Sequence, residues 1–200
     1  MVDTVRTEEQ ILALFADNTT GDISAQDARD MIVSVFAETR RDGFMDYNDT
    51  ATATTPITLV DNVWTPLTND GLGAFSNDTY KPAGVAQLLD TVTGAFDFSE
   101  LSLGDSVLIR NDFVVTQSQN NSLLSMRYTL GTGAGAYSLE TVLLTKFDGS
   151  AGSVHRLALG ADYLYMGDTN TRDNPVTLEV KLENGGSVIN NGSVIQVLKR

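Results

Sequence analysis

The chain has 200 residues, 42% of which are hydrophobic, and carries 13 Lys and Arg against 26 Asp and Glu, for a net charge of −13. This length and hydrophobic content suit one domain of ordinary size with an appendage. Phosphate binding needs concentrated positive charge, so the composition argues against nucleic acid as a direct ligand. The absence of cysteine removes disulfides, thiolate catalysis and cysteine-based zinc sites.

Two further features of the composition bear on where the protein works. No apolar run approaches the roughly 18 residues that a membrane helix needs, and the start is not basic and then apolar, so we expect neither membrane insertion nor a signal peptide. The acidity is uneven, because residues 1–50 carry 4 basic and 11 acidic residues (−7) and residues 51–200 carry 9 and 15 (−6). The simplest interpretation of this acidity is solubility.

Two short helices are expected at the N-terminus. Thr7-Glu8-Glu9-Gln10 has the form of a capping box and predicts a helix from about Glu8 to Ala16. Ser24 is expected to cap a second helix, in which apolar residues recur at helical spacing. Helices this short need a partner surface. We interpret their apolar residues as helix-packing or anchoring contacts: Ile11, Leu12, Leu14, Phe15, Met31, Ile32, Val35 and Phe36.

The sequence divides into three regions. Residues 1–43 form the helical region, and residues 44–56, which are small, polar and without periodicity, are interpreted as a linker. Residues 57–200 show the strand-like alternation of a β-sandwich. The clearest strand runs from Val176 to Glu183, with its apolar residues on one face. The other expected strands are Ile57–Val60, Val63–Leu67, Val107–Thr116, Leu124–Leu130, Tyr137–Phe147, Val154–Tyr165, Ser187–Ile189 and Val194–Leu198.

Turn residues separate these strands, and no helical pattern lies between them. Asn190-Asn191-Gly192 is interpreted as the turn between the last two. About eight to ten strands with short turns predict an antiparallel sandwich or barrel. The predicted class is therefore mainly β, an antiparallel sandwich preceded by a short two-helix region.

Several short motifs could carry chemistry, and each has a structural interpretation that we prefer. Ser106 and His155, the only histidine, would be the partners in a hydrolase, but they lie in different strands with no sequence cue for a triad. Gly131–Ala136 matches a loose dinucleotide fingerprint without a following helix, so a hairpin loop is expected. A calcium loop around Gly21 is disfavoured, because it would place Ala16 at the first ligand position, where a side-chain oxygen is needed. We expect no catalytic residue, cofactor or metal.

Three segments carry a resemblance to a known family. Thr7–Phe15 (TEEQILALF) and Ile23–Val35 (ISAQDARDMIVSV) look like a cassette that recurs at or near the start of phage structural proteins. Gly192–Val197 (GSVIQV) is similar to a closing jelly-roll strand. The chain thus resembles phage virion proteins that join an N-terminal helical anchor to a jelly roll of the tumour-necrosis-factor-like kind, as in head fibres, decoration proteins and short tail fibres.

The resemblance implies a non-enzymatic structural protein of a bacteriophage. Such a protein would be a jelly-roll homotrimer, made in the host cytoplasm and attached by its helices to capsid or tail proteins on the exterior of the virion. An alternative keeps the fold and makes the distal loops a receptor- or glycan-binding tip for host attachment, which would need exposed aromatic residues with nearby carboxylates. Trp64, Tyr163 and Tyr165 could stack on a sugar, but aromatic residues in strands more often belong to a core or an interface. The hydrolase of Ser106 and His155 is the third hypothesis.

Overall fold

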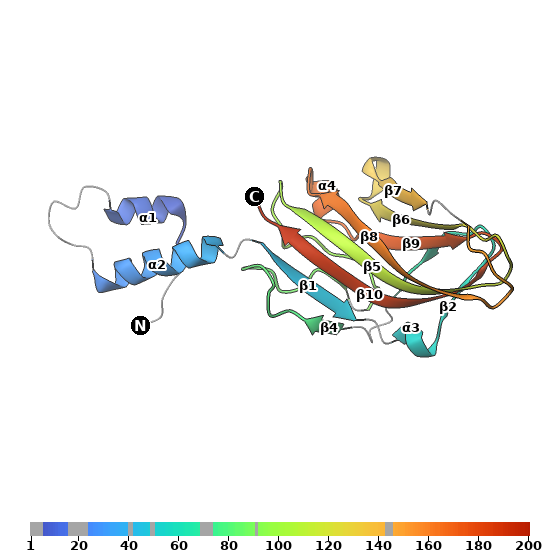
Figure 1. Cartoon of the computed structure of the whole chain (residues 1–200). Coiled ribbons are helices and arrows are strands. Elements are labelled where there is room, and N and C mark those ends of the chain that lie inside the picture. The colour runs from blue at the N-terminus through green and yellow to red at the C-terminus, as the bar shows by residue number, and fades with distance from the viewer. Residues whose placement is uncertain are drawn as a thin grey trace. The chain divides into compact units, whose positions relative to one another are not determined.

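The computed structural model describes residues 6–15, 24–39, 42–48, 51–68, 74–90, 92–142 and 146–200. The chain forms two compact units, Met1–Asp42 and Gly43–Arg200. The first contains helices α1 (Glu8–Phe15) and α2 (Ala25–Thr39), and the second contains the strands of the described residues (Figure 1).

Both helices begin at the predicted caps. In α1, the Gln10 amide donates to Thr7 Oγ1 (3.3 Å) and the Thr7 amide donates to Gln10 Oε1 (3.0 Å), which is a reciprocal capping box. In α2, the Asp27 amide donates to Ser24 Oγ (3.1 Å). The Ser24 hydroxyl and amide both donate to the Asp27 carboxylate and lower its pKa. The predicted starts of both helices are confirmed, and α1 ends at Phe15, one residue before the predicted end.

An ion pair ties the segment before α1 to α2. Arg6 Nε lies 2.8 Å from Asp30 Oδ2, and the Arg6 amide donates to Ser34 Oγ at 2.9 Å. Asp30 and Ser34 are buried. A partly buried polar contact therefore helps to hold the helical unit together. Helices this short need such tertiary contacts, because they are marginally stable alone.

The second unit is a sandwich of two antiparallel sheets. Sheet A has the order β4-β1-β10-β5-β8, with β2 also paired to β10, and sheet B has the order β3-β9-β6-β7. The strands are β1 (Gly43–Asn48), β2 (Ile57–Leu59), β3 (Thr65–Pro66), β4 (Ala74–Asn77), β5 (Ser106–Gln117), β6 (Leu124–Leu130), β7 (Tyr137–Val142), β8 (Val154–Tyr165), β9 (Thr177–Leu182) and β10 (Gly186–Leu198). Short helices α3 (Ala51–Thr54), η1 (Gly133–Gly135) and α4 (Thr169–Arg172) lie between strands.

The chain crosses repeatedly from one sheet to the other. After β5 in sheet A it enters sheet B for β6 and β7, returns to sheet A for β8, crosses to β9 and finishes as β10 in the centre of sheet A. This succession makes a jelly roll, and it confirms the predicted fold class. The last strand pairs with β1, β2 and β5, so the C-terminal segment is part of the sheet.

The sandwich begins earlier than predicted. Gly43–Asn48 is strand β1, paired along its whole length with β10, and it contributes Met45 and Tyr47 to the core. The interpretation of residues 44–56 as a linker is therefore wrong. Met45 and Tyr47 alternate with Phe44, Asp46 and Asn48 as expected of a one-sided strand.

The end of the chain also differs from the prediction. Residues 186–198 form one long strand, and Asn190-Asn191-Gly192 is a β-bulge within it and not a turn. Thr52 of α3 holds the bulge, because its Oγ1 accepts from the Asn190 amide (2.8 Å) and donates to the Asn190 carbonyl (2.9 Å). Gly192 has a φ of +112° in this bulge, and glycine suits the position because it adopts positive φ more readily than other residues.

Side chains from both sheets form one hydrophobic core. Its largest fully buried members include Tyr47, Phe96, Phe98, Phe113 and Tyr128. Phe96 and Phe98 come from the long connection between β4 and β5. Phe96 exchanges two backbone hydrogen bonds with Val176 beside β9 (2.9 and 2.8 Å), and this closes one side of the sandwich.

Candidate functional site

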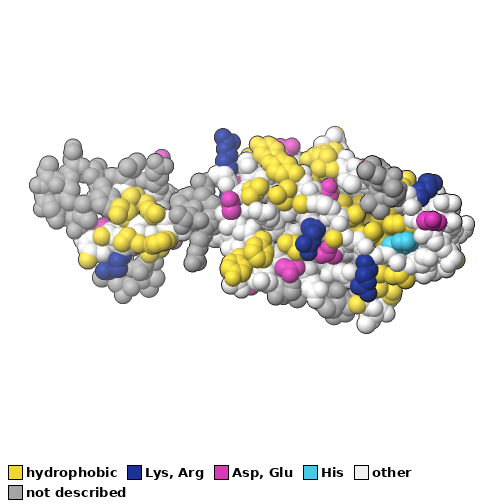
Figure 2. Space-filling view, in the orientation of Figure 1, with side chains coloured by type: hydrophobic (Ala, Val, Ile, Leu, Met, Phe, Trp, Pro, Cys, Tyr) yellow, Lys and Arg dark blue, Asp and Glu magenta, His cyan; other side chains and the backbone are white. Residues whose placement is uncertain are grey.

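The outer surface of sheet A carries more apolar side chains than a solvent-facing sheet needs. The sheet A face, as we name it, consists of outward residues of β1, β5, β8 and β10: Phe44, Leu108, Tyr163, Tyr165, Val194 and Leu198. Figure 2 shows hydrophobic side chains gathered over these strands, with basic and acidic side chains among them. A concentration of apolar side chains on an outer face makes this surface a candidate for an interaction site.

The strand register places these residues in rows. Phe44, Gln196, Leu108 and Tyr163 lie opposite one another across the four strands. In the next row, Ser106 lies between Leu198 and Tyr165. Tyr163 is 56% exposed and Tyr165 50% exposed. Two tyrosines with this much exposed ring provide a large area that a partner could bury.

A bulge in β8 determines which residues reach this face. Gly160 and Ala161 together oppose Arg110, so the alternation of β8 reverses at this point. Leu157 and Leu159 face inward before the bulge, and Leu164 faces inward after it, opposite Val107. If the same residues continued the alternation of Leu157 and Leu159 without a bulge, Tyr163 and Tyr165 would face the core and Asp162 would face solvent.

The second candidate surface is the side of the sandwich where β7 of sheet B and β8 of sheet A are the edge strands. We name it the open edge and define it by Tyr137, Leu139 and Thr141 of β7 with Asp162 of β8. The three β7 residues lie opposite Leu130, Tyr128 and Met126, so they share the core-facing side of sheet B. Leu139 is nevertheless 42% exposed, which shows that the core is incompletely covered here.

Asp162 is a carboxylate on the core-facing side of the open edge. It lies opposite Ile109, a fully buried core residue, and its Oδ1 accepts a hydrogen bond from Thr141 Oγ1 at 3.3 Å. Its Oδ2 is buried and has no hydrogen-bond partner among the described residues. Burial raises the pKa of this carboxyl above its ordinary value, because the charged form is poorly solvated.

A chain of polar side chains crosses the core near Asp162. Asn111 of β5 donates to the Tyr128 hydroxyl and accepts from Ser193 Oγ at 2.8 Å. All three residues are buried, and burial raises the pKa of the Tyr128 phenol, which therefore stays neutral. The negative charge of Asp162 is close enough to add to that shift.

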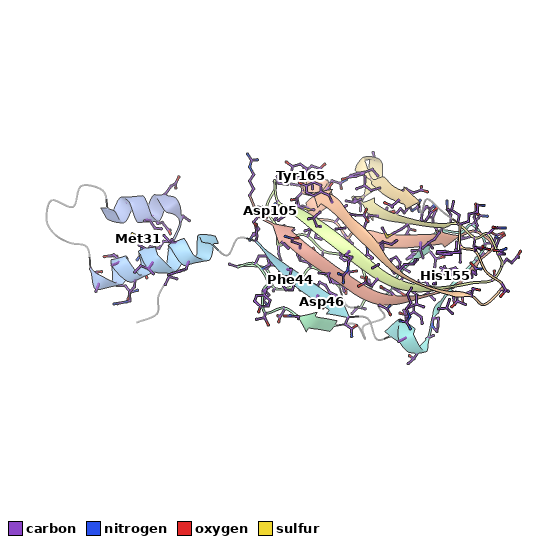
Figure 3. All side chains as sticks on the ribbon, viewed as in Figure 1. Met31, Phe44, Asp46, Asp105, His155 and Tyr165 are labelled. Carbon is purple, nitrogen blue, oxygen red and sulfur yellow. The ribbon has the colours of Figure 1, made fainter. Side chains whose placement is uncertain are left out.

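The hydrolase hypothesis is wrong on geometric grounds. Ser106 opens β5 and lies opposite Tyr165, whereas His155 lies opposite Val115, nine residues further along the same strand. At about 3.3 Å per residue the two are roughly 30 Å apart. Figure 3 places His155 and Tyr165 at opposite ends of the sandwich. Gly131–Ala136 is the connection between β6 and β7, as predicted.

His155 and Gln117 each contain a buried polar atom without a partner in the described part of the chain, Nε2 and Oε1 respectively. The His155 ring stacks on Phe147 with ring centroids 4.2 Å apart. The Gln117 Nε2 donates to the Gly149 carbonyl at 2.8 Å. Ordered water is the usual partner of such atoms.

The helical unit contains the residues predicted as anchoring contacts. On α2, Ile32 is 50% exposed, Val35 55% and Phe36 65%, while Met31 and, on α1, Ile11 are partly covered. The side chains of Leu12, Leu14 and Phe15 lie outside the described part of the structure. The α2 residues are thus placed where a partner could contact them, although Asp30 and Ser34 make the buried contacts.

The aromatic residues proposed for sugar stacking do not form one site. Trp64 lies beside sheet B, where the Arg127 guanidinium is 4.4 Å and the Lys181 ammonium 4.5 Å from its ring centroid. Tyr163 and Tyr165 belong to the sheet A face. The ring of Trp64 already packs against cations of the same chain, which leaves the two tyrosines as the exposed aromatic pair.

Among the described residues, no cluster of three or more His, Asp or Glu is arranged to hold a metal ion, and no helix is long and apolar enough to cross a membrane. One acidic hollow in the described part of the chain is lined by Gln87, Leu89, Asp90, Asp97, Ser99 and Glu100. Its carboxylates accept hydrogen bonds from nearby backbone amides, such as that of Ala86 to Glu100 at 2.6 Å.

No family model and no curated protein matches the chain. Among solved structures, the globular domain of zebrafish complement 1qA protein is 12% identical with a TM-score of 0.41, over 79% of this chain and 96% of that one. A chain of infectious bursal disease virus, Gx strain, is 14% identical with a TM-score of 0.34, over 72% of this chain. The match spans only 31% of that viral chain. Neither is a phage protein, and these weak similarities define no family.

Proposed function

We propose that this chain is a non-enzymatic structural protein of a bacteriophage virion, a homotrimeric fibre or capsid decoration protein on the exterior of the particle. The observation that carries the proposal is the sheet A face, an apolar outer surface on a sandwich whose core is already formed by its other side. The resemblance of the N-terminal segments to phage structural proteins supports the virion assignment. The helical unit is the proposed attachment to capsid or tail proteins.

The two candidate surfaces fit a ring of copies. The sheet A face and the open edge are different parts of one chain, so a contact that joins them is heterologous, and a heterologous contact closes into a ring when the rotation allows. In the proposed homotrimer, the exposed Tyr137 and Leu139 of one copy pack on the Leu108 and Tyr163 region of the next. Both surfaces would then be removed from water.

Replacing Leu108 with glutamate tests this assembly. Leu108 is central in its row and faces outward, so the change leaves the core intact but buries an unpaired charge in the interface, which costs about 3 kcal/mol or more. We expect light scattering on the full chain to show a trimer for wild type and a monomer for L108E. V92E is the matched control, because Val92 is 71% exposed and lies outside the sheet A face. A trimer of undiminished stability in L108E contradicts the proposed interface.

Attachment through the helices is tested with particles that lack the protein. Because the sandwich begins at Gly43, the shortened chain must comprise residues 43–200. We expect both forms to be trimers and only the full chain to bind the particles in a sedimentation assay. The full-chain variant V35E should also bind more weakly, since Val35 is an exposed residue of α2. Binding by residues 43–200 alone would refute the anchor.

A second candidate function uses the end of the sandwich away from Gly43. The register pairs Gly43 with Val197, so the chain enters the sandwich at the end where it also finishes. The opposite end carries the loops after β5, before β8 and after β9. The Asp61 carboxylate connects the segment after β2 to the loop after β9, because it accepts a hydrogen bond from the Asn184 amide at 2.8 Å. This end would be the receptor- or glycan-binding tip of a tail fibre.

A further inference from the structure

The open edge contains a carboxylate where an interface of apolar side chains would be expected. The bulge at Gly160–Ala161 turns Asp162 toward the core-facing side, between Ile109 of β5 and Thr141 of β7. Thr141 satisfies only Oδ1. A buried oxygen of an ionised carboxylate without a donor is costly, and the cost rises as the remaining water is removed.

Among the described residues, none provides a positive charge next to Asp162. Of the elements packed against it, β5 contributes the apolar Ile109, β7 contributes Thr141, and β6 contributes the phenol of Tyr128, the one titratable group among the described residues that faces it. The neighbouring Arg110 and Glu140 face the outer sides of their sheets, opposite Val194 and Arg127. Protonation is therefore the available way to remove the charge.

We propose that Asp162 is a proton-uptake site of the open edge, and that covering this edge with a second copy of the chain protonates it, so that self-association strengthens as the pH falls. The inference rests on the proposed function, because it assigns a regulation to the proposed contact between copies. A protonated Asp162 can also donate a hydrogen bond from its carboxyl O–H, whereas the ionised carboxylate can only accept one.

The sign of the effect follows from the direction of the pKa shift. The ordinary pKa is 3.8 and burial raises it, so the protonated form is favoured by the folded chain and more strongly by the covered edge. The stabilisation is fully present below about pH 4 and is lost as the pH rises through the raised pKa. Each proton taken up changes the association constant by up to tenfold per pH unit in that interval.

The net charge of −13 complicates a simple pH titration, because acid reduces repulsion between any two acidic copies. The test therefore compares variants of the full chain. Asp162→Asn removes the charge and keeps a side chain that Thr141 can contact. Glu140→Gln is the matched control, since Glu140 lies on the same edge, faces outward, and its replacement also removes one negative charge.

Sedimentation equilibrium of the wild type and both variants between pH 4 and 8 gives the association constants. We expect D162N to associate more tightly than wild type at pH 8, by about tenfold or more. The slope of the logarithm of the association constant against pH should fall in D162N by up to one proton per copy. In E140Q this slope should equal that of the wild type. Equal slopes in wild type and D162N, with association present, overturn the inference and leave the proposed trimer standing. Absence of association in all three proteins at every pH overturns the trimer as well.

Discussion

Replacing Gly192 with alanine will destabilise the sandwich by about 4 kcal/mol or more. A Cβ at this position would lie 1.9 Å from the Tyr47 carbonyl oxygen and 2.9 Å from its carbonyl carbon. Both atoms are backbone of β1, so no side-chain rotation relieves the clash. The φ of +112° adds strain, because L-residues rarely adopt it. Strand β1 must therefore separate from β10 at the bulge.

Gly152→Ala is the control for the backbone angle alone. Gly152 has a φ of +85°, and no atom lies within 4 Å of the place that a Cβ would occupy, so we expect a cost of only about 1 kcal/mol. Urea unfolding at one fixed protein concentration measures both variants, because association would otherwise shift the apparent stability. Equal midpoints for G192A and G152A would show that β1 does not pack on β10 as described.

The position of Gly192 illustrates which parts of the fold the sequence can and cannot predict. Strands β5, β6, β8 and β9 are predictable because apolar residues alternate over most of their length. The Asn190-Asn191-Gly192 bulge resembles a turn in sequence, since turns and bulges favour the same residues that tolerate positive φ. Strand β1 escapes prediction because only two inward residues, Met45 and Tyr47, mark it beside a run of small polar residues.

The candidate surfaces are less predictable than the strands. Val107-Leu108-Ile109 is a continuous apolar run in β5, and this signal for a strand covered on both faces could have indicated the sheet A face. No comparable signal exists for Asp162. Alternation counted from Leu157 and Leu159 would place Asp162 outward, and only the pairing with Arg110 of another strand reveals the bulge that places it inward. Local pattern cannot supply register between strands far apart in the chain.

Asn111→Ala will cost about 3 kcal/mol or more, although the residue has no apolar side chain to lose. Asn111 is fully buried, donates to the Tyr128 hydroxyl and accepts from Ser193 Oγ. Alanine removes both contacts at once and leaves two buried hydroxyl groups without that partner, each at about 1–3 kcal/mol. Urea unfolding of N111A against wild type measures the loss.

The coupling within this polar chain separates lost hydrogen bonds from a simple cavity. Y128F removes the hydroxyl that accepts from Asn111 Nδ2, while the double variant N111A/Y128F removes both members of the pair. If the bond is the source of the stability, the double variant will be less destabilised than the sum of the single variants, by about 1 kcal/mol. Strict additivity would mean that Asn111 acts by filling space. The polar chain links β10, β5 and β6, so its removal should also loosen the core beneath Asp162 at the open edge.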